Sequence, residues 1–318
     1  EWVRDKEVVL ITGTHGKSTT TALAGLMAIE SGLDPVVIVG SKVPTFADGN
    51  VRSGVGRAWI IEGDEYAKHF LAFHPVAVLI NNIELDHTDI FPALVDIMDT
   101  FRELLHQVRD RGLVVANADD PNVSALIGSE RASLEARGVR IVTYGYGAHA
   151  MVRVSDEMIR TGEQQFLLKD EAGHLIRACL RIPGRMNVVN TTGAAALVLN
   201  LGGRPEAIRE AVAGFTGIWR RFECVTDKDG VLVVSDYGHH PTAVRVTLEA
   251  ARSFYAGRRI VLCFQPHQHN RTRHLFLDFV SAFDLADALL LSEIYDVPGR
   301  EEKEDASVSS KDLEDAIR

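Results

Sequence analysis

The sequence predicts an α/β fold in two domains: a central domain of the phosphate-loop type, built on a mostly parallel sheet, and a Rossmann-like C-terminal domain. Short apolar runs alternate with helical stretches along most of the chain, which is typical of parallel α/β sheets. A glycine-rich turn joins the first apolar run to the first helical stretch. The length of 318 residues suits two domains, and a hydrophobic content of 46% is enough for their cores.

The central domain is predicted at residues 1–217. The apolar run at residues 8–12 indicates a buried strand, and residues 18–31 indicate a helix with one apolar face. Further strands are expected at residues 36–39, 58–61, 76–80 and 113–116, with a helix at residues 94–108. From about residue 141 to residue 182, short alternating segments at residues 165–168 and 175–182 predict antiparallel strands, followed by helices at residues 187–201 and 205–213.

The link at residues 214–219 is the predicted domain boundary, so that the second domain covers residues 218–318. Strand and helix alternate again beyond it. Strands are expected at residues 231–235, 260–264 and 288–291, and helices at residues 242–255 and 272–283. The charged and polar stretch at residues 299–310 predicts a mobile loop.

Composition excludes several classes of function. The formal net charge of −10 argues against a nucleic-acid partner, because neutralising phosphates along a strand needs a basic face. No apolar run approaches the roughly 20 residues of a membrane span, and no signal peptide is recognisable. Three widely spaced cysteines predict neither a disulfide framework nor a zinc site. We therefore expect a cytoplasmic protein with no membrane or nucleic-acid partner.

The turn after the first strand has the chemistry of a phosphate-binding loop. Its glycines let backbone N–H groups turn towards phosphate oxygens, and the following helix adds a partial positive charge. Lys17 can reach the β and γ phosphates of a bound nucleotide, and the Ser18 hydroxyl can bind Mg²⁺. The spacing departs from the standard loop, because Ile11 stands where the first glycine would be. The predicted nucleotide-binding residues are Gly13, Thr14, His15, Gly16, Lys17, Ser18 and Thr19.

Acidic residues follow two of the later strands. Glu62 ends one apolar run, and residues 81–87, which include Asp86 and His87, follow the next. A carboxylate at the carboxyl end of a parallel strand faces the ligand crevice, and Mg²⁺ needs only one or two carboxylates. The adjacent His239 and His240 have no further ligand group at metal spacing, so the sequence predicts Mg²⁺ and not zinc.

These motifs resemble those of the Mur ligases, and the resemblance covers nearly the whole chain. The variant loop Gly-Thr-His-Gly-Lys-Ser is similar to the ATP loop of that family. Glu62 matches the family's metal-binding glutamate, and His87 matches a histidine that helps to hold a second Mg²⁺. Many members carry a carbamylated lysine on the next helix, whereas residues 88–110 contain no lysine and Arg102 lies near the equivalent place. The resemblance thus implies the metal ligands Ser18, Glu62 and His87.

Motifs in the second half extend the resemblance. Asn187 and Asn190 match asparagines on the adenine side of ATP, although Met186 replaces the usual histidine between them and Arg185. Arg221 matches an arginine that reaches the γ-phosphate. The blocks at residues 235–241 and 264–272 are similar to those of the L-alanine-adding subgroup, with Ser235 and Gln268 as departures. The resemblance implies that Asp236 binds nucleotide, that Lys17, Arg221, Asp236 and His239 are catalytic, and that the substrate contacts are His87, Tyr237, His239, His267 and Arg271.

The resemblance implies an ATP-dependent, ADP-forming ligase that joins L-alanine to UDP-N-acetylmuramate through an acyl phosphate, with ATP and Mg²⁺ as cofactors. The segment at residues 81–92 leans instead towards the family's recycling ligases, which join a tripeptide to the same acceptor. Family members also have an N-terminal UDP-binding domain with no counterpart here, and the C-terminal domain stops early. A third hypothesis is therefore a nucleotide-binding fragment without complete ligase activity.

Overall fold

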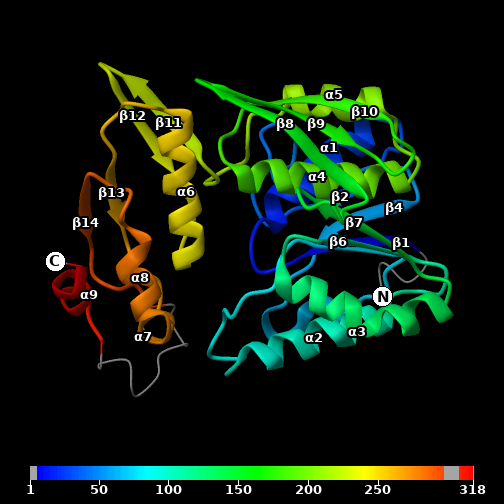
Figure 1. Cartoon of the computed structure of the whole chain (residues 1–318), viewed down its shortest axis with the longest axis horizontal. Coiled ribbons are helices and arrows are strands. Elements are labelled where there is room, and N and C mark those ends of the chain that lie inside the picture. Colours follow the sequence, from blue (N-terminus) through cyan, green and yellow to red (C-terminus); the bar gives the residue numbers. More distant parts are fainter. Residues whose placement is uncertain (1–5, 297–307, 318) are drawn as a thin grey trace.

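The computed structural model describes residues 6–296 and 308–317. Residues up to 217, here called the sheet domain, form a large sheet covered by helices, and the later residues, here called the C-terminal domain, lie beside one end of it (Figure 1). Among the described helices, none is both long enough and apolar enough to cross a membrane. The loop predicted at residues 299–310 lies mostly outside the described residues, and its last residue begins helix α9.

The sheet domain is built on one ten-stranded sheet, within the described residues, in the order β10-β9-β8-β7-β6-β5-β1-β4-β2-β3. The strands from β8 to β2 along this order pair in parallel, and β2–β3, β8–β9 and β9–β10 pair antiparallel. Their bounds are β1 Glu7–Thr12, β2 Val36–Ile38, β3 Val51–Arg52, β4 Ala58–Glu62, β5 Ala77–Ile80, β6 Leu113–Asn117, β7 Arg140–Gly145, β8 Val152–Arg160, β9 Glu163–Lys169 and β10 Leu175–Leu180.

This confirms the predicted mostly parallel sheet with an antiparallel end, with one correction. The change to antiparallel pairing was expected from about residue 141, but β7 lies parallel to β6. The reason is helix α3, Pro121–Ala136, which was not predicted. This crossover helix returns the chain to the end of the sheet at which β6 begins, so that β7 runs parallel to β6. The antiparallel part begins only where β8 meets β9.

Helices cover both faces of the sheet (Figure 1). On one face α1 (Lys17–Glu30), α4 (Arg185–Asn200) and α5 (Pro205–Gly214) pack on one another over an apolar core. On the other face α2 (Leu94–Gln107) packs against α3 over a second core. Because β1 and β5 are buried from both sides, their sequences are continuous apolar runs, as expected for central parallel strands. A short 3₁₀ segment, Tyr66–Ala72, follows β4.

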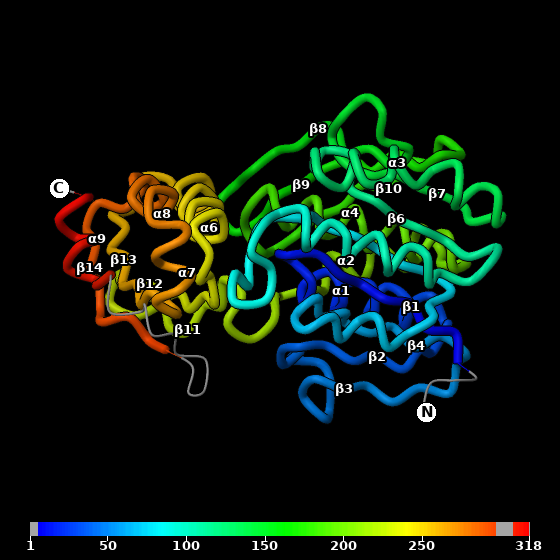
Figure 2. Tube along the Cα trace, turned by 90° about the horizontal axis from the view of Figure 1, so that it is seen from below, coloured from blue at the N-terminus to red at the C-terminus, as the bar shows by residue number. Residues whose placement is uncertain are grey.

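The C-terminal domain has strands in two pairs within the described residues. Strand β11 (Glu223–Lys228) lies antiparallel to β12 (Val231–Ser235), and β13 (Val261–Phe264) lies parallel to β14 (Ala288–Leu291). The single helix expected at residues 272–283 is two helices, which meet at Leu275. Figure 2 shows its helices gathered on the side facing the sheet domain: α6 Pro241–Phe254, α7 His269–His274 and α8 Phe276–Ala282, with α9 Ser310–Ile317 farther out.

Candidate functional site

The phosphate loop between β1 and α1 has a backbone that requires glycine. Gly13 and Gly16 have φ angles of 134° and 81°, which side chains rarely adopt. A Cβ at Gly16 would lie 2.5 Å from the Asn190 Oδ1 atom on α4. The predicted glycine turn is therefore present, and it is packed tightly against the helix that carries the two predicted adenine-side asparagines. Thr19 is buried in the first turn of α1.

Two asparagines after β5 brace the loop. The Asn82 side-chain oxygen accepts a hydrogen bond from the His15 backbone N–H at 2.7 Å, and the Asn82 carbonyl accepts one from the Thr14 N–H at 3.1 Å. The Asn81 amide donates to the His15 carbonyl at 3.2 Å and accepts from the Tyr144 hydroxyl at 3.1 Å. The loop is thus held in shape by its own domain.

Lys17 is paired with a buried carboxylate. Its ammonium donates to the Gly13 carbonyl at 2.8 Å and to both oxygens of Glu65, at 2.9 and 2.8 Å. The Glu65 side chain is fully buried. These charge-assisted bonds hold the ammonium at the edge of the phosphate loop, next to the place where an anion would bind.

Ser18 and Glu62, two of the three predicted metal ligands, lie together. The Ser18 hydroxyl donates to Glu62 Oε1 at 2.8 Å, while the other Glu62 oxygen accepts a hydrogen bond from the Gly40 backbone N–H. Two adjacent ligands of an octahedral Mg²⁺ lie about 2.9 Å apart, given metal–oxygen distances of about 2.0–2.1 Å. The oxygen donors and their spacing therefore fit Mg²⁺.

The third predicted ligand, His87, faces a different carboxylate. Its Nε2 lies 3.9 Å from Glu65 Oε1, and its ring atoms group with Asp64 and Glu65. Its buried Nδ1 has no hydrogen-bond partner, its φ of 53° is left-handed, and burial lowers the pKa of the imidazole. A strained, neutral imidazole with a spare nitrogen suits a ligand-binding role. Arg102, by contrast, pairs with Asp99 on α2 and Glu130 on α3.

Helix α4 carries Asn187 and Asn190 towards the loop. Asn190 donates from its amide to the Asn187 side-chain oxygen at 3.3 Å, and Asn187 donates to the Pro183 carbonyl at 2.7 Å. Beside the start of this helix a cavity of about 580 Å³ separates the sheet domain from α6. Its lining includes Arg185, which stacks over the Tyr146 ring at 3.9 Å, and Met186.

A buried ion pair joins the two domains. Arg271 Nε on α7 donates to Asp86 Oδ1 at 2.8 Å, and both side chains are about 95% buried, at 5% and 4% exposure. The His239 Nε2 lies 3.8 Å from the other Asp86 oxygen. Burial acts to raise the pKa of Asp86, but His239, Arg271 and His87 outweigh it and hold that pKa well below its usual range. Asp86 is therefore ionised at neutral pH in the folded protein.

Glu84 makes a second link across the same junction, which we call the seam (residues 84–88, 239–242 and 267–271). Its Oε2 accepts a hydrogen bond from Thr242 Oγ1 at 2.9 Å and lies 3.2 Å from His15 Nε2. His240 Nδ1 lies 3.7 Å from the same oxygen. Burial acts to raise the pKa of Glu84, but the hydrogen bond from His15 and the two histidines outweigh it and lower that pKa. Thr88 and Asn270 form a further hydrogen bond across the seam.

The predicted substrate contacts gather at this seam. The ring centroid of His239 lies 5.0 Å from that of Tyr237 and 5.9 Å from that of His267. Arg271 donates to the His267 carbonyl at 3.1 Å. Burial lowers the pKa of His239. The structure thus brings Tyr237, His239, His267 and Arg271 together on the C-terminal side, facing Asp86 and its neighbour His87.

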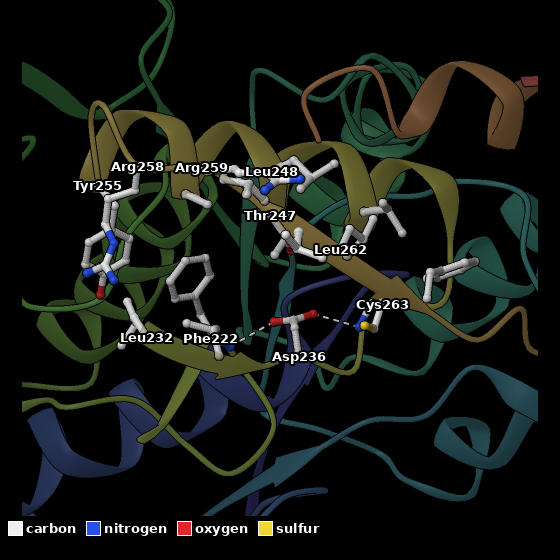
Figure 3. Close-up of a pocket in the computed structure, with 17 residues that line it drawn as sticks. Phe222, Leu232, Asp236, Thr247, Leu248, Tyr255, Arg258, Arg259, Leu262 and Cys263 are labelled. Atoms are coloured by element: carbon white, nitrogen blue, oxygen red, sulfur yellow. Dashed lines mark hydrogen bonds between the residues drawn. The ribbon is translucent and has the colours of Figure 1, made fainter. Parts of the chain in front are cut away.

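The Asp236 carboxylate is hydrogen-bonded to the backbone on both sides. Its two oxygens accept hydrogen bonds from the Phe222 N–H at 2.8 Å and the Gly238 N–H at 2.6 Å (Figure 3). It therefore ties the turn of Arg221, whose guanidinium lies 5.2 Å from the Tyr237 ring centroid, to the loop before α6. A mostly apolar cavity of about 230 Å³ lies behind it, between α6, β12 and β13. No phosphate-loop residue lines that cavity, so it is separate from the predicted nucleotide-binding loop.

Sequence reasoning missed the roles of Glu65, Glu84 and His240. A role for Glu65 could have been predicted, since it lies three residues after Glu62, at the carboxyl end of the same strand. Glu84 and His240 both lie in motifs of the sequence, but their contact could not be predicted, because they are 156 positions apart and meet only through the folding of both domains.

Comparisons with known proteins agree with the motifs. The model of the Mur ligase middle domain matches residues 11–198, and that of the Mur ligase glutamate ligase domain matches residues 220–318. The UDP-N-acetylmuramate–L-alanine ligase of Solibacter usitatus is 37% identical over 100% of this chain and 65% of its own length. That of Solidesulfovibrio magneticus is 38% identical over 93% and 63%. The solved structure of the UDP-N-acetylmuramate–alanine ligase of Thermotoga maritima has a TM-score of 0.77 at 26% identity, covering 98% of this chain and 64% of that one. The chain thus spans less than two thirds of these proteins.

Proposed function

Because the chain belongs to the Mur ligase family, we propose that it provides the ATP-binding and amide-forming parts of a ligase that adds L-alanine to UDP-N-acetylmuramate in peptidoglycan synthesis. The observation that carries this proposal is the position of residues 81–88. This loop braces the phosphate loop through Asn82 and Thr14, and it meets the C-terminal domain through Asp86 and Arg271. A nucleotide bound at the phosphate loop and an acceptor bound at the seam would therefore lie next to each other, on either side of residues 81–88.

The reaction proceeds through an acyl phosphate. An acceptor carboxylate oxygen attacks the γ-phosphorus of ATP, and the bond from that phosphorus to the bridging oxygen breaks, so that ADP leaves. The alanine amine then attacks the acyl carbon, phosphate departs from the tetrahedral intermediate, and the nitrogen loses a proton. Both steps gather negative charge between the two domains, so fixed positive groups lower the barrier.

The residues of the chain divide this work. The loop at residues 13–19 binds the phosphates by its N–H groups, and Lys17 moves from Glu65 to the γ-phosphate. Ser18 and Glu62 would hold Mg²⁺, with His87 close to Glu65 as a further ligand, and the ion would supply charge neutralisation on the phosphates. Asn187 and Asn190 lie beside the cavity at the start of α4, which suits the adenosine.

The seam binds the acceptor and the amine. His239 stays neutral at pH 7 because its burial lowers its pKa, so it can accept a hydrogen bond or the amine proton. Tyr237, His267 and Arg271 surround it. Arg221 adds positive charge at the γ-phosphate, and Asp236 orients it by holding its turn to the loop before α6. A cytoplasmic location is part of this proposal, because the proposed substrates, ATP and UDP-N-acetylmuramate, are nucleotides.

A ligation assay tests the proposal. The full-length gene product is incubated with ATP, Mg²⁺ and UDP-N-acetylmuramate, in parallel with L-alanine and with a cell-wall tripeptide, and both ADP and the amide product are measured. We expect L-alanine to be the preferred amine. Preference for the tripeptide, which residues 81–92 favour, would make the protein a recycling ligase. ATP binding without either product would leave only nucleotide binding.

A further inference from the structure

Two histidines and a glutamate meet at the seam with their ligand atoms in one place. His15 comes from the phosphate loop, Glu84 from the loop after β5, and His240 from the start of α6. His15 Nε2, Glu84 Oε2 and His240 Nδ1 all lie within 4.8 Å of one another. Against the sequence-based expectation of Mg²⁺ and not zinc, we propose that these three side chains form a binding site for a divalent transition-metal ion of the zinc type, separate from the Mg²⁺ ligands Ser18 and Glu62.

The spacing fits such an ion. His15 Nε2 and His240 Nδ1 lie 3.2 and 3.7 Å from Glu84 Oε2. In a tetrahedral zinc site with bonds of about 2.0–2.1 Å, neighbouring ligand atoms lie about 3.3 Å apart. The two spacings to Glu84 Oε2 are within about 0.4 Å of this value, and the third, between His15 Nε2 and His240 Nδ1, is no more than 4.8 Å. Rotation of the two imidazoles towards each other would bring the three atoms to bonding distance, and water would complete the shell.

His240 is already arranged as a ligand. Its Nε2 lies 3.3 Å from the Leu85 carbonyl, which can only accept, so Nε2 carries the hydrogen and Nδ1 has the free lone pair. The Thr242 backbone N–H donates to that Nδ1 at 3.3 Å, which confirms the tautomer and is the contact that an ion would displace. A backbone carbonyl on the far nitrogen is the usual way in which proteins orient metal-binding imidazoles.

The charge states favour the same ion. Burial and the neighbouring His15 lower the pKa of His240 to about 4, so no proton competes for its lone pair at pH 7. Glu84 is held ionised and accepts a hydrogen bond from the Thr242 hydroxyl, which orients it. Two imidazoles and one carboxylate select zinc-type ions over Mg²⁺, which prefers oxygen ligands and water.

A second group, Asp64, Glu65 and His87, provides the contrast. There the Lys17 ammonium already lies on both Glu65 oxygens, so the negative charge has a cation from the protein itself. Within the part of the chain that the structure describes, no lysine or arginine forms a hydrogen bond or ion pair with the His15, Glu84 or His240 side chain. An ion there would fasten the phosphate loop to α6 and so hold the two domains together.

The test is titration of the purified, chelator-treated protein with Co²⁺ in excess Mg²⁺, because tetrahedral Co²⁺ absorbs in the visible range. We expect one equivalent to bind with these bands, Zn²⁺ to displace it, and Zn²⁺ to raise the melting temperature. His15→Gln and His240→Gln should each weaken binding by at least about 100-fold, since each removes a ligand. The matched control His87→Gln, in the second group, should keep it.

The His15→Gln variant is expected to fold, because the His15 side chain is partly exposed and its replacement leaves no cavity in a hydrophobic core. Circular dichroism of both variants shows whether they fold. The proposal is overturned if no Co²⁺ binds below millimolar concentration, or if folded His15→Gln binds it as tightly as the original protein. Neither readout depends on ligase activity, so failure of the proposed function would not imitate failure of this site.

Discussion

The phosphate loop and the seam are both polar clusters, but they are held in different ways. The loop is fixed within one domain, where Asn81, Asn82 and Glu65 lie just after β5 and β4, the two strands next to β1. The seam is fixed only when two domains meet, since Asp86 and Arg271 lie 185 positions apart. The loop can therefore form as soon as the sheet does, whereas the seam reports on the contact between domains.

The two regions also differ in how deeply their charged side chains are buried. Lys17 remains 15% exposed beside the buried Glu65, so its ammonium can exchange one anion for another. Arg271 and Asp86 are both almost fully buried, so neither can leave without a large electrostatic cost. The loop is suited to binding and release of phosphates, and the Arg271–Asp86 pair within the seam to holding the two domains together.

The largest expected effect is at the seam. Arg271→Ala leaves the Asp86 carboxylate buried without its main partner, so we expect the free energy of unfolding to fall by about 3–5 kcal/mol. Urea denaturation measures it. Arg131→Ala, which removes an exposed pair with Glu135, is the matched control and should cost no more than about 0.5 kcal/mol. Equal losses in the two variants would contradict a structural role for the seam.

The next effect is at the loop. Lys17→Ala should weaken binding of Mg-ATP by about 2–4 kcal/mol, because a phosphate charge loses its charge-assisted partner. Calorimetric titration provides the affinity. Lys68→Ala, which removes an exposed pair with Glu103, should bind ATP as the original protein does. Unchanged affinity in Lys17→Ala would mean that the loop does not bind phosphate.

Substitution of two glycines distinguishes the stability cost of side-chain packing from the cost of backbone strain. Gly16 and Gly32 have nearly equal φ angles, 81° and 80°, but a Cβ would meet Asn190 at Gly16 and nothing within 4 Å at Gly32. Gly32→Ala should cost about 1 kcal/mol of stability from the backbone alone, and Gly16→Ala about 1–3 kcal/mol. Thermal unfolding of both variants gives the difference. A smaller loss at Gly16 would show that α4 is not packed on the loop as described.

Acid should open the seam before it unfolds the loop. His240 has its pKa lowered to about 4, so the folded protein binds fewer protons there than the unfolded chain. The stabilisation is complete above the ordinary histidine value of about 6.5 and is lost as the pH falls towards 4. Asp86, whose pKa is also lowered, loses its contribution at still lower pH. Unfolding measured from pH 7 to pH 4 should show this loss, and His240→Gln should reduce it, while His87 and His239, whose pKa values are also lowered by burial, keep their own contributions.

The elements that could be predicted from the sequence are those determined by residues close together in the chain. The β1 strand, the glycine turn and α1 follow from a continuous apolar run and a local motif, and the structure has all three. Helix α3 was missed because small and charged residues blur its apolar face, although Asp120 before Pro121 is a regular helix start. The contacts of Glu84 could not be predicted, because they depend on how the domains pack.

The central claim is that loop and seam form one site, and Arg221 tests it most directly. Turnover and ATP affinity are measured side by side for Arg221→Ala in the full-length gene product. Because Arg221 comes from the C-terminal side and should stabilise charge mainly in the transition state, we expect kcat to fall by about 100-fold or more with ATP affinity nearly unchanged. Unaffected turnover in a folded Arg221→Ala variant would contradict the claim that the two domains share one active site.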